Sequence, residues 1–123
     1  MIRGFEEQTE ALSEYELDTL LPVIVNGLKV KIGAENAVIN KSIVSGMRAK
    51  KFIISEARVR KIINYIRTHN LIPCLIATSK GYYVTNDKDE LSCYIQTLKS
   101  REDAIRQVRN CMEGWLKEQM QII

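Results

Sequence analysis

The chain has 123 residues, of which 46% are apolar and 27% are charged, which is the usual balance of one folded domain. There is no run of about 18 apolar residues and the first residues are acidic, so we expect neither a membrane span nor a signal peptide, and a cytoplasmic protein. Cys74, Cys93 and Cys111 are widely spaced and there is a single histidine, which argues against a disulfide framework and a zinc site.

The net charge of +3 is distributed unevenly along the chain. Residues 1–18 hold one basic and six acidic residues, whereas residues 48–67 hold seven basic residues against Glu56 alone. Residues 88–118 hold six residues of each sign, which is typical of a solvated helix with mixed ion pairs. The positive charge is therefore concentrated in the middle of the chain.

The first predicted element is a helix that follows an acidic segment, residues 1–12, which we expect to be flexible. Ser13 and Glu16 match a capping box, so this helix should begin at residue 14. Pro22 lacks an amide hydrogen and crowds the preceding turn, which predicts a kink or a second helix start at residues 21–22. Gly33 can end the helix, and the short apolar segment 37–39 can pair as a single strand.

Two further helices are predicted between residues 40 and 69. Asn40 can cap a short helix over residues 41–51, and Ser55 can cap a helix that runs to about residue 69. At about 100° per residue, one stripe of the second helix is apolar and consists of Val59, Ile62, Ile63 and Ile66. The opposite face is small, basic and amide-bearing. It consists of Ala57, Lys61, Asn64 and Thr68, with Arg58, Arg60, Tyr65 and Arg67 at its flanks.

A β-hairpin should follow the basic helix at once. Pro73 prevents further helix, and residues 74–77 and 82–85 have the composition of two short strands. The intervening letters TSKG are turn residues, with Gly81 able to take a positive φ. Lys80 is thus expected at the tip of the hairpin.

The order helix, short strand, helix, basic helix, hairpin over residues 14–85 resembles the winged helix-turn-helix family. The SKGYY hairpin also resembles that of small uncharacterised phage and mobile-element proteins with this fold. In that family the third helix enters the DNA major groove, and the hairpin, or wing, lies against the backbone or minor groove. The resemblance implies two sets of DNA-binding positions. They are Ala57, Arg58, Arg60, Lys61, Asn64 and Tyr65 on the recognition helix, and Thr78, Ser79 and Lys80 at the wing tip. The apolar linker 51–54 departs from the family, because it lacks the glycine often found in that turn.

The chemistry of the basic helix favours nucleic acid independently of this resemblance. Phosphate contact needs several mobile cations on one face, and base recognition needs planar donors such as arginine or an amide. The helix supplies both, so we expect double-stranded DNA as the partner. Two other interpretations stay open: the charged face could only solvate an amphipathic helix, or it could bind an acidic protein. We find no phosphate loop, nucleophile elbow or paired-carboxylate motif, and therefore expect no enzyme activity, metal or cofactor.

The last third of the chain predicts one long helix over residues 87–120. Asp87 and Glu90 match a capping box, and no proline follows. Counting in sevens gives two series of positions. They are Leu91, Leu98, Ile105 and Met112, and Tyr94, Arg101, Val108 and Trp115. This heptad face, with one polar interruption, either pairs with the same helix of a second chain or folds back on its own domain. A helix of about 30 residues is about 45 Å long, more than a small domain can cover, which favours a homodimer.

Together these patterns predict a mainly α protein with a small β-hairpin: a winged helix-turn-helix domain over residues 13–86, followed by a long C-terminal helix. The expected function is DNA binding by a dimeric transcription regulator, or by a replication or maintenance factor of a phage or mobile element. The alternative function is a winged-helix interaction module whose basic face meets an acidic protein.

Overall fold

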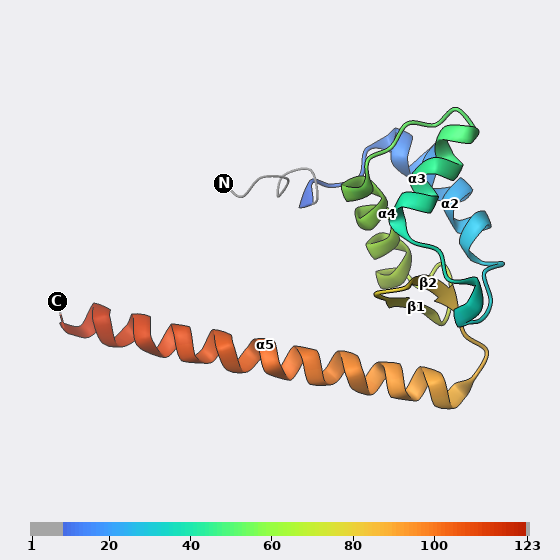
Figure 1. Cartoon of the computed structure of the whole chain (residues 1–123). Helices are drawn as coiled ribbons and strands as arrows, with labels where there is room; N and C mark the ends of the chain where they lie inside the picture. Colours follow the sequence, from blue (N-terminus) through green and yellow to red (C-terminus); the bar gives the residue numbers. More distant parts are fainter. Residues whose placement is uncertain (1–8, 123) are drawn as a thin grey trace. The chain divides into compact units, whose positions relative to one another are not determined.

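The computed structural model describes residues 9–122. The chain divides into two compact units, with the boundary between Asn86 and Asp87. The first unit combines short helices with a two-stranded hairpin, and the second is one long helix (Figure 1). This confirms the predicted fold class, mainly α with a small hairpin and a long C-terminal helix. Within residues 9–122, no helix has the length and apolar character needed to cross a membrane.

The first helical segment begins with the predicted capping box. The Ser13 amide donates to Oε1 of Glu16 at 2.9 Å, and the Glu16 amide donates to Oγ of Ser13 at 3.1 Å. Residues Glu16–Leu20 are π-helical and lead directly into α2 (Leu21–Leu28), so the helical path passes through Pro22. Because proline crowds the carbonyl group four residues before it, a wider turn just ahead of Pro22 relieves the clash that a regular α-helix would suffer.

The chain between α2 and the next helix pairs with the hairpin. Ala34–Asn36 form a short 3₁₀ turn after Gly33. Val38 then exchanges two backbone hydrogen bonds with Tyr82, at 2.8 and 3.0 Å, so the predicted single strand at residues 37–39 is an isolated antiparallel bridge. A second bridge, parallel and not predicted, joins Ile32 to Val84.

Helices α3 (Asn40–Ala49) and α4 (Glu56–Thr68) lie close to the predicted ranges. Oγ of Ser55 caps α4 by accepting a hydrogen bond from the Arg58 amide at 3.2 Å, as predicted. The predicted cap at Asn40 is wrong, because Asn40 lies inside α3 and the capping position is Ile39. Oδ1 of Asn40 instead accepts a hydrogen bond from the Tyr82 hydroxyl at 2.9 Å, which ties α3 to the hairpin.

The hairpin consists of β1 (Leu75–Thr78) and β2 (Gly81–Val84), each shifted by one residue from its predicted range. The strands are antiparallel, with Leu75 opposite Val84 and Thr78 opposite Gly81. Gly81 has φ +122°, and a Cβ at this position would clash with the Val38 carbonyl group. A side chain is therefore excluded at Gly81 both by the backbone conformation and by the backbone of Val38 beside it.

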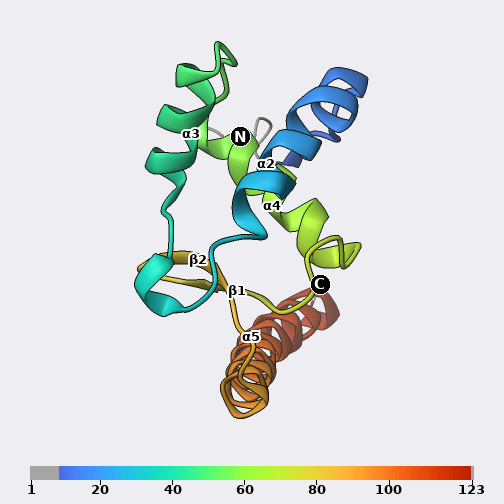
Figure 2. The ribbon, with the colours of Figure 1, turned by 90° about the vertical axis from the view of Figure 1, so that its right-hand side faces the viewer.

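The core of the first unit lies where α2, α3, α4 and the hairpin meet, as Figure 2 shows with α2 and α3 in front of α4. The apolar stripe predicted for α4 supplies its centre, with side chains that are at most 2% exposed. The buried cluster consists of Leu20, Ile24, Leu28, Met47, Ile54, Val59, Ile62, Ile63, Ile66, Ile72, Leu75 and Val84. Because this stripe faces inward, the orientation of α4 is fixed and its polar face must point away from the core.

The second unit is α5 (Lys88–Ile122), a helix of 35 residues. Oδ1 of Asp87 accepts hydrogen bonds from the amides of Asp89 and Glu90, at 2.9 and 3.3 Å, so the helix starts where the capping pattern predicts.

Candidate nucleic-acid interface

The outer face of α4 is the surface that the sequence assigns to DNA. Arg60, Asn64 and Thr68 are exposed, whereas Ala57, Lys61 and Tyr65 are half-buried. Arg60 and Asn64 lie one turn apart, so a cation and an amide occur next to each other on one side of the helix. Such a face can contact a phosphate and a base edge at once.

Arg58 lies at the edge of this face but its guanidinium group is used within the fold. Its Nε and Nη2 atoms donate to the two carboxylate oxygens of Glu16, at 2.8 and 2.7 Å. Nη1 and Nη2 also donate to the backbone carbonyls of Glu10 and Ala11, at 2.9 and 3.2 Å. The Arg58 side chain is only 15% exposed. We therefore remove Arg58 from the predicted DNA-contacting set, because binding a phosphate would require breaking a bidentate buried pair.

The same interaction explains the protonation state of Glu16. The hydrogen bonds from Arg58 lower the pKa of the Glu16 carboxyl from 4.5 to about 2, and the hydrogen bonds from Ser13 act in the same direction, while burial opposes them. The carboxylate is thus charged at neutral pH and neutralises Arg58. Arg58 also donates to the backbone carbonyls of residues 10 and 11, so these two residues of the segment that was predicted to be flexible are hydrogen-bonded to α4. Residues 1–8 of that segment lie outside the described part of the chain.

The remaining charges on α4 are better placed for a partner than Arg58. The Arg60 guanidinium lies 3.8 Å from the Glu56 carboxylate, and both side chains are more than a third exposed, so this pair is weak. Lys61 lies between Ala57 and Asn64 on the centre of the outer face, by the geometry of the helix. Glu56 is the only acidic residue within α4, so the face keeps a positive charge.

Tyr65 and His69 form the aromatic part of this end of α4. Their rings stack with centroids 3.9 Å apart and an angle of 20° between the planes. Nδ1 of His69 also lies 3.0 Å from the Tyr65 carbonyl oxygen. The His69 ring is thus stacked on the Tyr65 ring at the C-terminal end of α4.

The hairpin tip, which consists of Thr78, Ser79 and Lys80, is exposed as predicted. Oγ1 of Thr78 accepts a hydrogen bond from the Lys80 amide at 3.1 Å and donates to the Gly81 carbonyl at 3.3 Å. Thr78 therefore serves to close the turn. Ser79 and Lys80 have exposed side chains, which leaves a hydroxyl group and a cation at the tip.

The turn between α3 and α4 is a further exposed basic segment that the sequence analysis did not assign to the site. Lys51 has φ +70°. Its amide donates to the Arg48 carbonyl at 2.8 Å, and the Phe52 amide donates to the Met47 carbonyl at 2.8 Å, which is a Schellman motif. A lysine thus takes the place of the glycine expected there. In the linker that follows, Ile54 is buried whereas Ile53 is 86% exposed, a difference that three consecutive apolar residues do not reveal in the sequence.

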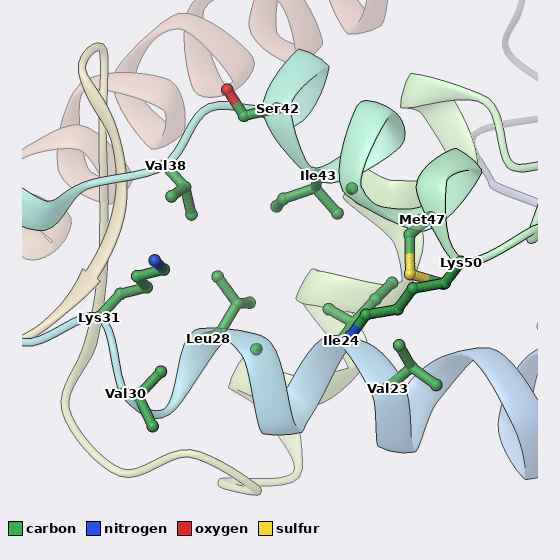
Figure 3. Close-up of a pocket in the computed structure, with 12 residues that line it drawn as sticks. Val23, Ile24, Leu28, Val30, Lys31, Val38, Ser42, Ile43, Met47 and Lys50 are labelled. Atoms are coloured by element: carbon green, nitrogen blue, oxygen red, sulfur yellow. The ribbon is translucent and has the colours of Figure 1, made fainter.

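A groove of about 430 Å³ lies between α2 and α3 (Figure 3). Its wall is mainly apolar, with the side chains of Lys31 and Lys50 at its two ends. Gly27 and Gly46 also line the groove. A Cβ at either position would meet no atom within 4 Å, so the absence of a side chain there leaves open space. None of the DNA-binding positions predicted from the sequence lines this groove.

The heptad positions of α5 differ in exposure along the helix. Leu91 and Tyr94 are half-buried, whereas the later apolar positions are 39–70% exposed. These later positions are Leu98, Ile105, Val108, Met112 and Trp115. Three further apolar side chains that were not predicted to lie on this face are also more than half exposed: Ile95, Leu116 and Met120. Ile95 and Leu116 lie beside the heptad positions and widen this apolar face.

Among the residues that the structure describes, no group of three or more histidine, cysteine, aspartate or glutamate side chains is arranged to hold a metal ion. Comparisons with protein-family models, with curated proteins and with solved structures give no match for this chain.

Proposed function

We propose that the chain binds double-stranded DNA, with α4 in the major groove in the manner of a winged helix-turn-helix protein. The observation that carries the proposal is the outer face of α4. There Arg60, Lys61 and Asn64 lie together while the apolar stripe of the same helix is buried in the core. An α-helix with its side chains is about 10–12 Å wide, which matches the width of the major groove.

The residues of this face have separate roles in the proposal. Asn64 is suited to an adenine edge and Arg60 to a guanine edge, because each offers a planar group. Lys61 supplies a mobile cation for a phosphate. Ala57 and Tyr65 border these residues, and the small side chain of Ala57 lets the helix backbone come close to the groove.

The hairpin acts as the wing. Ser79 and Lys80 supply a hydroxyl donor and a cation to the phosphate backbone, and they do not select the base sequence. Lys50 and Lys51, in the turn before α4, are exposed cations that add phosphate contacts at the other end of the same helix.

Two chains act together through the heptad face of α5. A dimer with two-fold symmetry carries two copies of α4, and each copy contacts one half-site, so the bound sequence is an inverted repeat. A dimer of this kind serves as a transcription regulator, or as a replication or maintenance factor of a phage or mobile element.

Selection of bound duplexes from a random pool, followed by sequencing, tests this function. The proposal expects an enriched inverted repeat from the full chain, and loss of enrichment in the Asn64→Ala variant. If the pool is not retained at low salt but an acidic protein is, the basic face is a protein-binding surface instead.

A further inference from the structure

The heptad face of α5 is long, apolar and exposed. The helix has 35 residues, about 52 Å at 1.5 Å per residue. Its exposed side chains include Trp115 at 63%, Met112 at 67% and Ile105 at 70%. Scattered apolar residues are normal on a protein surface, but a heptad stripe of this length, with Arg101 as its one polar position, is typical of an interface.

We propose that two copies of α5 pair in antiparallel orientation, with Ile105 of one chain opposite the partner's Val108. This inference rests on the dimer in the proposed function and adds its orientation and register. In this register Leu98 also meets the partner's Trp115, so a large ring packs against a smaller branched side chain.

Arg101 argues against the parallel orientation. In a parallel pair in register, each heptad position faces its own copy, so the two Arg101 guanidinium groups would meet inside the interface. Like charges placed there are costly, because neither is compensated. In the antiparallel register, Arg101 lies opposite the partner's Met112. Its aliphatic stem can cover the thioether while its charged end reaches water.

The charges beside the heptad face select one antiparallel register. Glu102 and Arg109 are 70% and 65% exposed and lie on the same edge of the face, one heptad apart. With Ile105 opposite the partner's Val108, Glu102 meets the partner's Arg109, and by symmetry this pair forms twice. Ile95 meets the partner's Leu116 on the same edge.

Neighbouring registers lack this complementarity. A shift of one heptad in one direction places Glu102 opposite the partner's Glu102, and a shift in the other direction places Arg109 opposite the partner's Arg109. Both shifts also shorten the overlap of the two helices. The flanking charges therefore favour a single register of the antiparallel pair.

Charge reversal tests this register. The Glu102→Arg variant should place two arginines together in each of the two symmetry-related pairs, and Arg109→Glu should place two glutamates together in each. Each variant should raise the dimer dissociation constant by roughly tenfold or more, since two pairs change at once. The double variant should return it to within about threefold of the wild type. Lys117→Glu, on the opposite side of the helix, is the matched control and should leave it unchanged.

The double variant also separates the interchain pair from contacts within one helix. Glu102 pairs with Arg106 at 3.2 Å and Arg109 with Glu113 at 3.6 Å, and both contacts stay lost in the double variant. Recovery of the dimer therefore reports only the pair between chains. Helicity measured by circular dichroism should fall in both single variants and stay low in the double variant.

Sedimentation equilibrium over a range of protein concentrations provides the dissociation constants. Single variants with a wild-type constant, or a double variant weaker than both, would overturn the antiparallel register while leaving the dimer intact. A wild-type chain that sediments near 14.1 kDa at every concentration would overturn the dimer and the register together. Neither result would affect binding of the first unit to DNA, which is measured separately.

Discussion

The guanidinium group of Arg58 and the carboxylate of Glu16 form an ion pair at 2.7 Å, although the two residues are 42 positions apart in the chain. The pair joins the first helical segment to the start of α4 and neutralises a cation that would otherwise belong to the basic face. The surface proposed to bind DNA is consequently narrower than the sequence predicts, and the first turn of α4 is held in place by this ion pair.

Replacing Arg58 should therefore act on stability. We expect Arg58→Ala to lower the free energy of unfolding by about 2–4 kcal/mol, because it leaves the largely buried Glu16 carboxylate without its main partner. Arg60→Ala, on an exposed neighbour, should change it by no more than about 0.5 kcal/mol. Urea unfolding of both variants measures the difference. Wild-type stability with selective loss of DNA binding in Arg58→Ala would restore this arginine to the interface.

The pair also predicts an acid limit of stability. The pKa of Glu16 is lowered to about 2 in the fold, below its ordinary value of 4.5, so protonation favours the unfolded chain. The contribution of Glu16 is complete above about pH 4.5 and is lost as the pH falls towards 2. Unfolding free energies measured across this window should decline less steeply for Glu16→Gln than for the wild type. Equal slopes would show that the carboxylate is not stabilised by folding.

Residues at the centre of the basic face should affect binding and leave folding intact. Lys61→Ala and Asn64→Ala should each change the free energy of unfolding by about 0.5 kcal/mol or less, and both should weaken DNA binding. Ile63→Ala, on the buried side of the same helix, should instead cost about 2–4 kcal/mol in stability. Thermal unfolding and anisotropy titrations separate the two effects. A large loss of stability in Lys61→Ala and Asn64→Ala would mean that this face packs against protein.

The hairpin tip should contribute to affinity but not to sequence preference. Lys80 is exposed at the turn, where its side chain can approach a phosphate. Lys80→Ala should weaken binding to all duplexes by a similar factor and reduce the magnitude of the salt slope by about one. Titration of several unrelated duplexes at several salt concentrations gives both quantities. An altered preference with an unchanged slope would assign Lys80 a base contact.

Local signals in the sequence predicted much of the fold. The capping residues Ser13, Ser55 and Asp87 mark helix starts that the structure confirms, because a cap depends on residues within one turn. The apolar stripe of α4 fixed which face is buried, and the turn letters located the hairpin to within one residue. The first helix begins as predicted, but it ends at Leu28 and not at Gly33, and its π-helical turn before Pro22 was not predicted.

Contacts between distant segments were not predictable in the same way. A helical wheel places Arg58 beside the basic face, and nothing within α4 reveals that Glu16 approaches it. The bond between Asn40 and Tyr82 likewise depends on the packing of α3 against the hairpin. The heptad face of α5 was predicted from its spacing, whereas Ile95 and Leu116 were missed because they lie just outside the strict repeat.

The turn after α3 gives a prediction about backbone strain. Lys51 occupies the left-handed conformation that glycine adopts at lower cost, and its backbone amide already makes the required hydrogen bond. Lys51→Gly should raise the free energy of unfolding by about 0.5–1 kcal/mol. Lys50→Gly, one residue earlier at φ −92°, is the matched control and should not stabilise the protein. A loss of stability in Lys51→Gly would mean that the lysine side chain contributes more than the backbone strain costs.

The salt dependence of binding to unrelated duplex DNA most directly tests whether the basic face of α4 and the hairpin tip bind phosphates. Each phosphate contact contributes about −0.9 to the slope of log K against log salt concentration. Four lysines are assigned to phosphates in the proposed complex: Lys50, Lys51, Lys61 and Lys80. They should therefore give a slope of about −3.6 per chain, and the Lys61→Ala and Lys80→Ala variants should each reduce its magnitude by about one. Anisotropy titrations between about 50 and 200 mM salt measure it. We expect a straight line with this steep negative slope. No binding at the lowest salt, or binding with a flat line, would contradict DNA binding through the basic face of α4.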